Sequence, residues 1–390
     1  MLDLLYQYNP WWEDDLPQTR FKKRDKYLSI ISQYFDQKQI LFITGLRRVG
    51  KTTLMKLIIK NLIDRGVDQR RILYVSLDDY MLRDKNIIDI LNEYRKLHKI
   101  TIDEKIYVFF DEITYKKDYH LQLKNIYDSQ NVKIFAASSS SSMLLDKKAY
   151  LTGRSITLEI NPLDLFEYMS FKGIKLKKRD AHLYPAYFKD YIRDGGLPEN
   201  VLSPSREYLM NLLDDIIQKD ITAFHGVKNS HILRDYYTLL MERSGKQLSI
   251  NKISNILKIS PDTSKRYLGY FQSTYLIHLL PRWGNTNARL LSPKKIYASD
   301  LGMKYLFVGE RDLGSYFENY IFLKLKNTKN LYYLYENGIE IDFYTNDKII
   351  IESKYYAELN TKQKKLFNEY PSNKRIIVDS IETLSLLDDL

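Results

Sequence analysis

The chain has 390 residues, of which 44% are hydrophobic and 28% charged, values typical of globular proteins with more than one hydrophobic core. No apolar stretch reaches the roughly 18 residues that a membrane helix needs, and the acidic, tryptophan-containing N-terminus does not resemble a signal peptide, so we expect a cytoplasmic protein with no membrane partner. The absence of cysteine excludes disulfides and thiolate metal sites, and the formal net charge of +11 favours polyanionic partners such as nucleic acid.

Helical and buried-strand patterns alternate from residue 20 to about residue 153, as a parallel α/β sheet requires. The predicted strands are 39–44, 72–77, 106–110, 133–137 and 155–160. We therefore predict that residues 1–158 form an N-terminal segment and an α/β core.

A glycine-rich loop follows the first predicted strand. Its residues are Gly45, Leu46, Arg47, Arg48, Val49, Gly50, Lys51, Thr52 and Thr53. The two glycines let backbone N–H groups and the next helix N-terminus point at phosphate oxygens, Lys51 would neutralise the β- and γ-phosphates, and Thr52 would offer its hydroxyl to Mg²⁺. Thr53 is small enough not to block the loop. The spacing in a strand-loop-helix context predicts a P-loop NTPase that uses ATP or GTP with Mg²⁺.

Two carboxylates end the third predicted strand. Asp111 would hold Mg²⁺ through water, and Glu112 would act as the general base that activates the water attacking the γ-phosphate. With Lys51, Glu112 is our candidate catalytic residue.

A polar run and an arginine follow the later strands. One serine among residues 138–142 would sense the γ-phosphate, unless the run is simply a flexible loop. Arg154 would contact phosphate in its own chain or in a neighbouring subunit, because a guanidinium binds phosphate through two hydrogen bonds; a surface arginine is the alternative. An oligomer would follow from the second option, but the sequence does not establish one.

Residues 159–231 are predicted to form a helical lid. Helices are expected over 164–171 and 184–193, and the breaker sequence 194–198 closes the second of them.

Residues 232–305 are predicted to form a winged-helix domain. Two helices meet at the break 260–262, where Ser260 or Asp262 would cap the second helix. Lys265 and Arg266 in its first turns would contact DNA, and the strand 275–280 with Arg282 and Trp283 beyond it would form the wing. Winged helices also join proteins to one another, so a protein partner stays an alternative.

Residues 306–390 carry a cluster of carboxylates and a lysine. Glu318 lies on a predicted helix, 316–325, whereas Asp342, Glu352 and Lys354 belong to predicted strands. Strand periodicity places Glu352 and Lys354 on one face. In a nuclease-like fold, Asp342 and Glu352 would bind Mg²⁺ or Mn²⁺, Glu318 would complete the metal shell, and Lys354 would orient a metal-bound water. The alternative is a pair of strands with polar outer faces.

The chain resembles predicted archaeal and bacterial AAA+ ATPases that carry a C-terminal domain of unknown function, DUF4143. The resemblance rests on the segments 9–12, 45–52, 111–112, 151–154, 161–163, 195–199, 300–302, 317–319, 340–342 and 352–354. The resemblance implies ATP rather than GTP, a helical lid, a winged helix and a restriction-endonuclease-like C-terminal domain. Two departures are the serines at 138 and 139, where a Thr-Gly-Ser pattern is usual, and the missing proline before Asp342.

These expectations combine into a Mg²⁺-dependent ATPase that binds DNA and couples hydrolysis to DNA handling, with a nuclease-like domain. The alternative is an ATP-driven switch that docks a protein partner through a degenerate, non-cleaving C-terminal domain.

Overall fold

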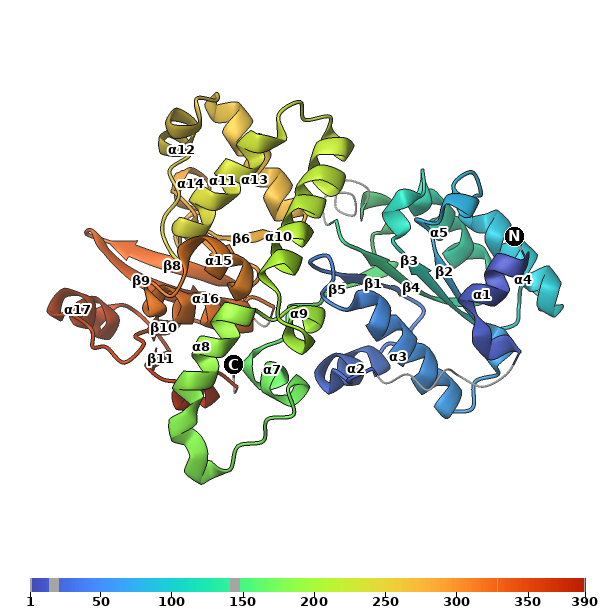
Figure 1. Ribbon diagram of the computed structural model, residues 1–390, viewed down its shortest axis with the longest axis horizontal. Coiled ribbons are helices and arrows are strands. Elements are labelled where there is room, and N and C mark those ends of the chain that lie inside the picture. The colour runs from blue at the N-terminus through green and yellow to red at the C-terminus, as the bar shows by residue number, and fades with distance from the viewer. Residues whose placement is uncertain (1, 14–20, 141–147, 328, 389) are drawn as a thin grey trace. The chain divides into compact units, whose positions relative to one another are not determined.

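The computed structural model describes residues 2–13, 21–140, 148–327, 329–388 and 390, and it divides into two compact units, Met1–Ile160 and Asn161–Leu390 (Figure 1). The predicted boundaries after residues 231 and 305 fall inside the second unit, so the division of that unit into lid, winged helix and nuclease-like domain stays a prediction.

Five strands of the described first unit form a parallel sheet in the order β2-β3-β4-β1-β5. They are β1 (Ile40–Thr44), β2 (Ile72–Ser76), β3 (Ile106–Asp111), β4 (Val132–Ser138) and β5 (Ser155–Glu159). All five strands were predicted, and no end differs from its prediction by more than one residue. The prediction of an α/β core with a parallel sheet is therefore confirmed.

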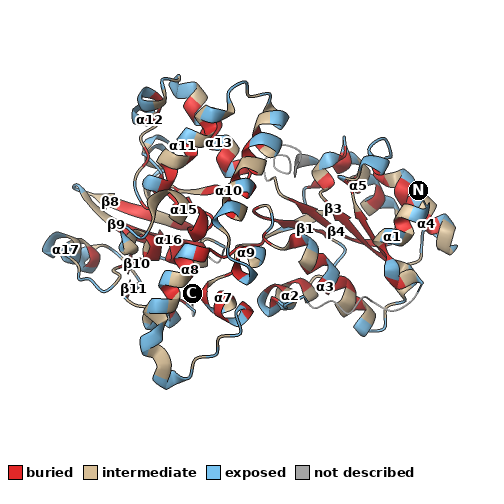
Figure 2. Cartoon of the chain, viewed as in Figure 1, coloured by how far each residue is buried: buried red, intermediate tan, exposed pale blue. Residues whose placement is uncertain are grey.

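Helices cover both faces of this sheet (Figures 1 and 2). They are α1 (Leu2–Tyr8), α2 (Asp25–Ser32), α3 (Lys51–Asp64), α4 (Ile87–His98) and α5 (Tyr119–Ser129). Apolar side chains of α4 and α5 share one buried core with the strands, and α3 packs against β4. Because both faces are covered, the inner strands are continuous apolar runs, which is why they were readable from the sequence.

The N-terminal segment pairs with β2, at the edge of the sheet. The side chain of Asn9 accepts a hydrogen bond from the Tyr74 N–H at 2.6 Å and donates one to the Tyr74 carbonyl at 2.9 Å. The indole N–H groups of Trp11 and Trp12 both donate to the Ile72 carbonyl. The resemblance motif at residues 9–12 thus covers backbone groups that an edge strand would expose.

A second sheet lies in the second unit, where four described strands have the order β11-β10-β9-β8. They are β8 (Leu331–Glu336), β9 (Ile339–Thr345), β10 (Ile349–Ser353) and β11 (Lys374–Val378); only the β10–β11 pair is parallel. One face packs against α16 (Leu313–Leu325), and the other against α17 (Thr361–Glu369). The predicted helix at 316–325 therefore begins three residues earlier, after the N-cap Asp312.

Most other elements of this unit are helical. They are α7 (Leu165–Phe171), α8 (Tyr184–Asp194), α9 (Pro198–Leu202), α10 (Arg206–Asp215), which continues as a π-helix (Ile216–Ala223), α11 (Ser230–Glu242), α12 (Ile250–Leu257), α13 (Pro261–Ser273), α14 (Thr286–Leu291) and α15 (Leu301–Val308). The described helices include none with the length and apolar character needed to cross a bilayer.

Four helices and two strands lie in the segment predicted as a winged helix, and α15 begins at its end. The strand β6 (Ile277–Leu280) pairs in antiparallel fashion with β7 (Lys295–Ala298), after α11, α12 and α13. The winged helix itself stays a prediction, and the structure shows where Arg282 and Trp283, which we expected in its wing, lie. Trp283 packs against the rings of Tyr332 and Tyr344, and Arg282 donates to the Tyr335 carbonyl, so both side chains lie against the C-terminal sheet.

The motifs at residues 195–199 and 300–302 contact each other, and this contact accounts for their glycines. Asp300 caps α15 and accepts a hydrogen bond from the Gly196 N–H at 2.7 Å. A Cβ on Gly195, whose φ is +75°, would lie 2.4 Å from the Asp300 carboxylate, and one on Gly302 would lie 2.7 Å from the Gly195 nitrogen. These glycines are required by close packing rather than by chemistry.

Candidate functional site

The phosphate-binding loop connects β1 to α3 at the carboxyl edge of the parallel sheet. Gly45 has φ +138°, and a Cβ there would lie 2.3 Å from the Ile160 carbonyl oxygen, so a side chain does not fit. Gly50 is the N-cap of α3 with φ +98°. The loop geometry that the sequence predicted from these glycines is present.

Lys51 folds back over this loop. Its Nζ lies 3.0 Å from the carbonyl oxygens of both Gly45 and Leu46. The Thr44 hydroxyl, at the start of the loop, is buried and has no hydrogen-bond partner among the described residues. An ammonium and an unsatisfied hydroxyl beside N-terminal helix amides are donors suited to phosphate oxygens. The loop therefore fits a nucleotide.

Thr52 and Asp111 meet at the end of β3. The Thr52 Oγ1 donates to Asp111 Oδ2 at 2.6 Å, and the buried Tyr74 hydroxyl donates to the same oxygen at 2.9 Å. A hydroxyl and a carboxylate oxygen are the hard ligands that Mg²⁺ prefers. The pair predicted to hold Mg²⁺ is thus brought together, and its donor chemistry fits that ion.

Glu112 follows Asp111 in a left-handed conformation, with φ 50°. Such a conformation is uncommon for a residue other than glycine and turns the side chain away from the strand pleat. Its Oε2 accepts a hydrogen bond from Ser139 Oγ at 3.3 Å. Burial raises the pKa of the Glu112 carboxyl and the nearby Lys51 ammonium partly offsets this, which leaves a better proton acceptor than an ordinary glutamate.

The serines that follow β4 lie beside these carboxylates. Ser138 Oγ lies 3.2 Å from Thr114 Oγ1 and accepts from the Ser140 N–H at 3.0 Å, whereas Ser139 reaches Glu112. Ser139 is therefore the described serine in direct contact with the candidate base. Residues 141 and 142 of the predicted sensor run lie outside the described residues.

Arg154 does not lie at this site. It precedes β5, and its carbonyl accepts from the Ile40 N–H at 2.8 Å, which places it at the amino edge of the sheet. The phosphate loop leaves the opposite edge, about 15 Å away along a five-residue strand. Arg154 instead forms a two-bond ion pair with Asp128, at 2.9 and 3.2 Å. The prediction of a phosphate contact within the chain is wrong for this reason; the contact across a subunit interface stays a prediction.

Lys265 and Arg266 are exposed on α13, as the DNA-contact prediction requires. Ser260 is the N-cap of this helix and accepts from the Thr263 N–H at 3.1 Å. Of the two capping residues considered, Ser260 is therefore the correct one. The buried face of α13 is fixed by Ser264, whose hydroxyl lies 2.9 Å from that of Tyr236.

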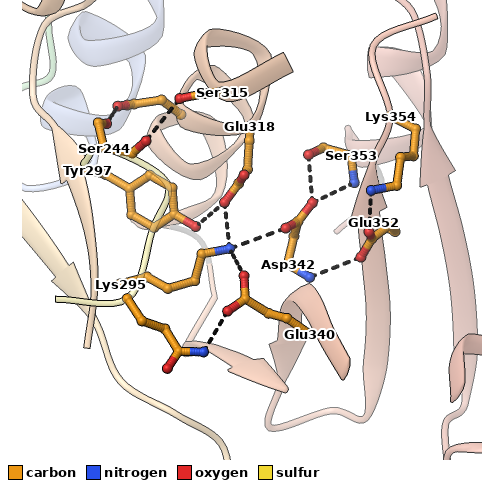
Figure 3. A network of polar contacts seen from close by, with 12 residues as sticks. Ser244, Lys295, Tyr297, Ser315, Glu318, Glu340, Asp342, Glu352, Ser353 and Lys354 are labelled. Atoms are coloured by element: carbon orange, nitrogen blue, oxygen red, sulfur yellow. Dashed lines mark hydrogen bonds and ion pairs between the residues drawn. The ribbon is translucent and has the colours of Figure 1, made fainter. Parts of the chain in front are cut away.

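The C-terminal carboxylates also converge (Figure 3). The Asp342 N–H donates to Glu352 Oε2 at 3.0 Å, and the Lys354 ammonium lies 3.0 Å from Glu352 Oε1. The Asp342 carboxylate accepts from both the N–H and the hydroxyl of Ser353. Glu352 and Lys354 thus contact each other as strand periodicity predicted.

A lysine that the sequence did not point to lies among these acids. Lys295 of β7 is fully buried, and its Nζ lies 2.6 Å from Glu318, 2.8 Å from Glu340 and 3.2 Å from Asp342 (Figure 3). The prediction that Glu318 completes a metal shell is therefore wrong, because its carboxylate binds an ammonium group and the Tyr297 hydroxyl. Within the described ranges, no group of three or more His, Cys, Asp or Glu residues could hold a metal ion.

Burial and crowding perturb this cluster. Burial and the charge of Asp342 raise the pKa of Glu318 to about 7 and that of Glu352 to about 8. Burial alone would lower the pKa of Lys295, but its carboxylate neighbours, Glu318 first among them, outweigh that effect and raise it. A cavity of about 250 Å³ adjoins the cluster and is lined in part by Glu318, Asp342 and Lys354.

Comparisons with known proteins identify part of the chain. Residues 37–169 match the AAA domain. This match covers the phosphate loop, Asp111 and Glu112, and together with their geometry it supports an AAA-like P-loop ATPase that binds nucleotide. Residues 185–312 match a domain of unknown function, DUF8612, so the family found there is not the DUF4143 family that the resemblance suggested.

Several relatives match along much of their length. An uncharacterized Methanocaldococcus jannaschii protein, MJ1544, is 29% identical over 88% of this chain and 80% of its own length. An uncharacterized Haemophilus influenzae protein is 25% identical over 77% of this chain and 78% of its own length. Among solved structures, that of AMPPCP-bound DnaA from Aquifex aeolicus matches 69% of this chain and 92% of its own length at 15% identity, with a TM-score of 0.33.

Sequence reasoning missed three residues of these sites. Tyr74 is one of many tyrosines and lies in an apolar strand, so nothing in the sequence singles it out. Glu340 was visible beside Asp342, but no role was assigned to it. Lys295 was missed because β7, the strand that carries it, was not predicted.

Proposed function

We propose that the chain is a Mg²⁺-dependent ATPase of the AAA+ superfamily that binds DNA and couples hydrolysis to DNA handling. The observation that carries the ATPase is the 2.6 Å contact between Thr52 and Asp111, with Glu112 next to it. Thr52 and Asp111 would hold Mg²⁺, and bound Mg²⁺ would screen the charge of the β- and γ-phosphates. Lys51 would exchange its loop carbonyls for phosphate oxygens, and Glu112 would take the proton of the attacking water.

The DNA half of the proposal rests on α13. Its exposed Lys265 and Arg266 follow a capped helix N-terminus, and the chain has a formal net charge of +11. In helix-turn-helix proteins, a helix with this arrangement is the recognition helix that lies in the major groove of DNA. We extend the proposal to a helical lid over residues 159–231 and a winged helix over residues 232–305. ATP hydrolysis would reposition the lid and the winged helix on the DNA.

The first test is ATP turnover with and without duplex, single-stranded and branched DNA. We expect DNA to stimulate turnover and Lys51→Ala to abolish it. The variant Lys265→Ala/Arg266→Ala should lower DNA affinity and reduce the slope of log K against log salt by about 1.8, since each lost phosphate contact removes about 0.9. Lys60→Ala, which changes an exposed lysine outside α13, is the matched control. Turnover that persists in Lys51→Ala would contradict the ATPase, and absence of DNA binding at low salt would contradict the DNA half.

A second function is favoured by one observation. The contacts of Lys295 with three carboxylates support a non-cleaving C-terminal region, as in an ATP-driven switch that docks a protein partner. DNA integrity in the same assays separates it from a restriction-endonuclease-like nuclease. DNA cleavage that Asp342→Ala abolishes would support the nuclease. The switch would be supported by slow ATP turnover with intact DNA, together with a protein partner that is retained only by Glu112→Gln in the presence of ATP.

A further inference from the structure

The carboxylate cluster of the second unit is already filled by a cation of the chain itself. The Lys295 ammonium contacts Glu318 of α16 and both Glu340 and Asp342 of β9, at 2.6, 2.8 and 3.2 Å, and the side chain is fully buried. A nuclease-like fold would place its divalent ion among these acids. An ammonium at the centre of three carboxylates from two elements takes that position.

The carboxylates are also held by other groups of the chain. Tyr297 donates to Glu318, Gln247 donates to Glu340 at 2.8 Å, and Ser353 donates twice to the far oxygen of Asp342. Carboxylates held in this way are already oriented around Lys295. A divalent ion would have to displace a buried ammonium and leave it without a counter-charge.

We infer that Lys295 substitutes for a divalent metal in this cluster, so that the unaltered chain binds no metal there, and that removing its ammonium creates a divalent-cation site formed by Glu318, Glu340 and Asp342. Carboxylate oxygens are suitable ligands for Mn²⁺. The distances from the Lys295 Nζ to Glu318 and Glu340, 2.6 and 2.8 Å, lie at or just above the upper end of the roughly 2.3–2.6 Å typical of Ca²⁺–oxygen contacts. The ammonium thus ties β7 to α16 and β9, a role that does not depend on ATP hydrolysis or DNA binding.

The test is Mn²⁺ binding by the full chain without nucleotide, measured by electron paramagnetic resonance, together with the melting temperature at each Mn²⁺ concentration. All chains carry Thr52→Ala, which weakens metal binding at the phosphate loop. The chain with no further change is compared with Lys295→Met, Lys295→Arg and Lys60→Met. We expect Lys295→Met to bind about one additional Mn²⁺, at least about tenfold more tightly than any site of the unaltered chain, and to melt at a higher temperature when Mn²⁺ is present. Lys295→Arg and Lys60→Met should show neither effect.

Two outcomes would overturn the inference. The first is Mn²⁺ binding by the unaltered chain that Asp342→Asn removes, and this comparison decides the matter even where Lys295→Met does not fold. The second is a Lys295→Met chain with an intact circular dichroism spectrum that gains no Mn²⁺. Because neither readout involves ATP or DNA, failure of this inference and failure of the proposed function are distinguishable.

Discussion

The two carboxylate sites of this chain use the same residue types and differ in where the lysine lies. In the first unit, Lys51 contacts the backbone carbonyls of its own loop, while Asp111 binds a hydroxyl. In the second unit, Lys295 contacts three carboxylates directly. A lysine that can turn away leaves acids available for an incoming cation, whereas a buried lysine between acids satisfies them permanently. The identity of the acids alone therefore does not predict a metal site.

The largest effect should come from Glu112→Gln in the first site. Glutamine keeps the size of the side chain but cannot take a proton, so kcat for ATP hydrolysis should fall by about 10²–10⁴-fold while ATP binding persists. Turnover and nucleotide affinity, measured side by side, check this. Glu310→Gln, an exposed glutamate of the second unit, is the control.

The same residue sets a pH dependence. Because burial raises the pKa of Glu112, its base form is lost on acidification at a pH above the usual value for glutamate. The rate of ATP hydrolysis should therefore fall as the pH drops through that raised pKa, whereas the residual rate of Glu112→Gln should not show this fall. If the rate of Glu112→Gln still fell at the same acid pH, the titrating group would be another residue.

The stability of the second site should depend strongly on its lysine. Lys295→Met leaves three carboxylates without their counter-charge, and we expect a loss of about 3–5 kcal/mol in the free energy of unfolding. Lys60→Met breaks an exposed ion pair with Asp64 and should cost about 0.5 kcal/mol or less. Urea denaturation of both variants measures the contrast. Equal losses would mean that the buried cluster is not the stabilising arrangement proposed here.

A smaller effect should appear in the pH dependence of stability. The pKa of Glu352 rises to about 8 in the folded chain, so the folded state holds a proton that the unfolded state releases near pH 4.5. The contribution of this group is therefore fully present below about pH 4.5 and is lost as the pH rises through about 8. We expect Glu352→Gln to flatten the fall in the free energy of unfolding between those two pH limits. A free energy of unfolding that falls as steeply with pH in Glu352→Gln as in the unaltered chain would contradict this.

The smallest effect should come from Tyr74→Phe. It removes a single hydrogen bond to Asp111 and keeps the buried ring, so kcat should fall roughly fivefold, about 1 kcal/mol. Tyr8→Phe removes the same group from a neighbouring tyrosine whose hydroxyl binds Asp79, and it should leave kcat unchanged. Similar losses in both variants would indicate a packing effect rather than positioning of Asp111.

Local patterns predicted the first site well because its chemistry depends on short segments. Gly45, Gly50, Lys51 and Thr52 are contiguous or nearly so, and Asp111 stands at the end of a strand whose apolar run marks it. In a parallel sheet such strand ends meet at one edge, so the convergence of Thr52 and Asp111 follows from the fold class. The expected phosphate contact of Arg154 was wrong because this residue precedes a strand. It therefore lies at the amino edge of the parallel sheet, whereas the phosphate loop leaves the carboxyl edge.

The sequence by itself determined the parallel α/β core, the phosphate loop and the pairing of Glu352 with Lys354, because these depend on spacing within one segment or between neighbouring strands. The tertiary structure alone decided that Tyr74 would hold Asp111, that Ser139 would contact Glu112, and that Lys295 would fill the acid cluster. The contacts Tyr74–Asp111, Glu112–Ser139 and Lys295–Asp342 join residues 37, 27 and 47 positions apart. No local pattern records such a contact, because it arises only when separate elements pack together and must satisfy one another's buried charges.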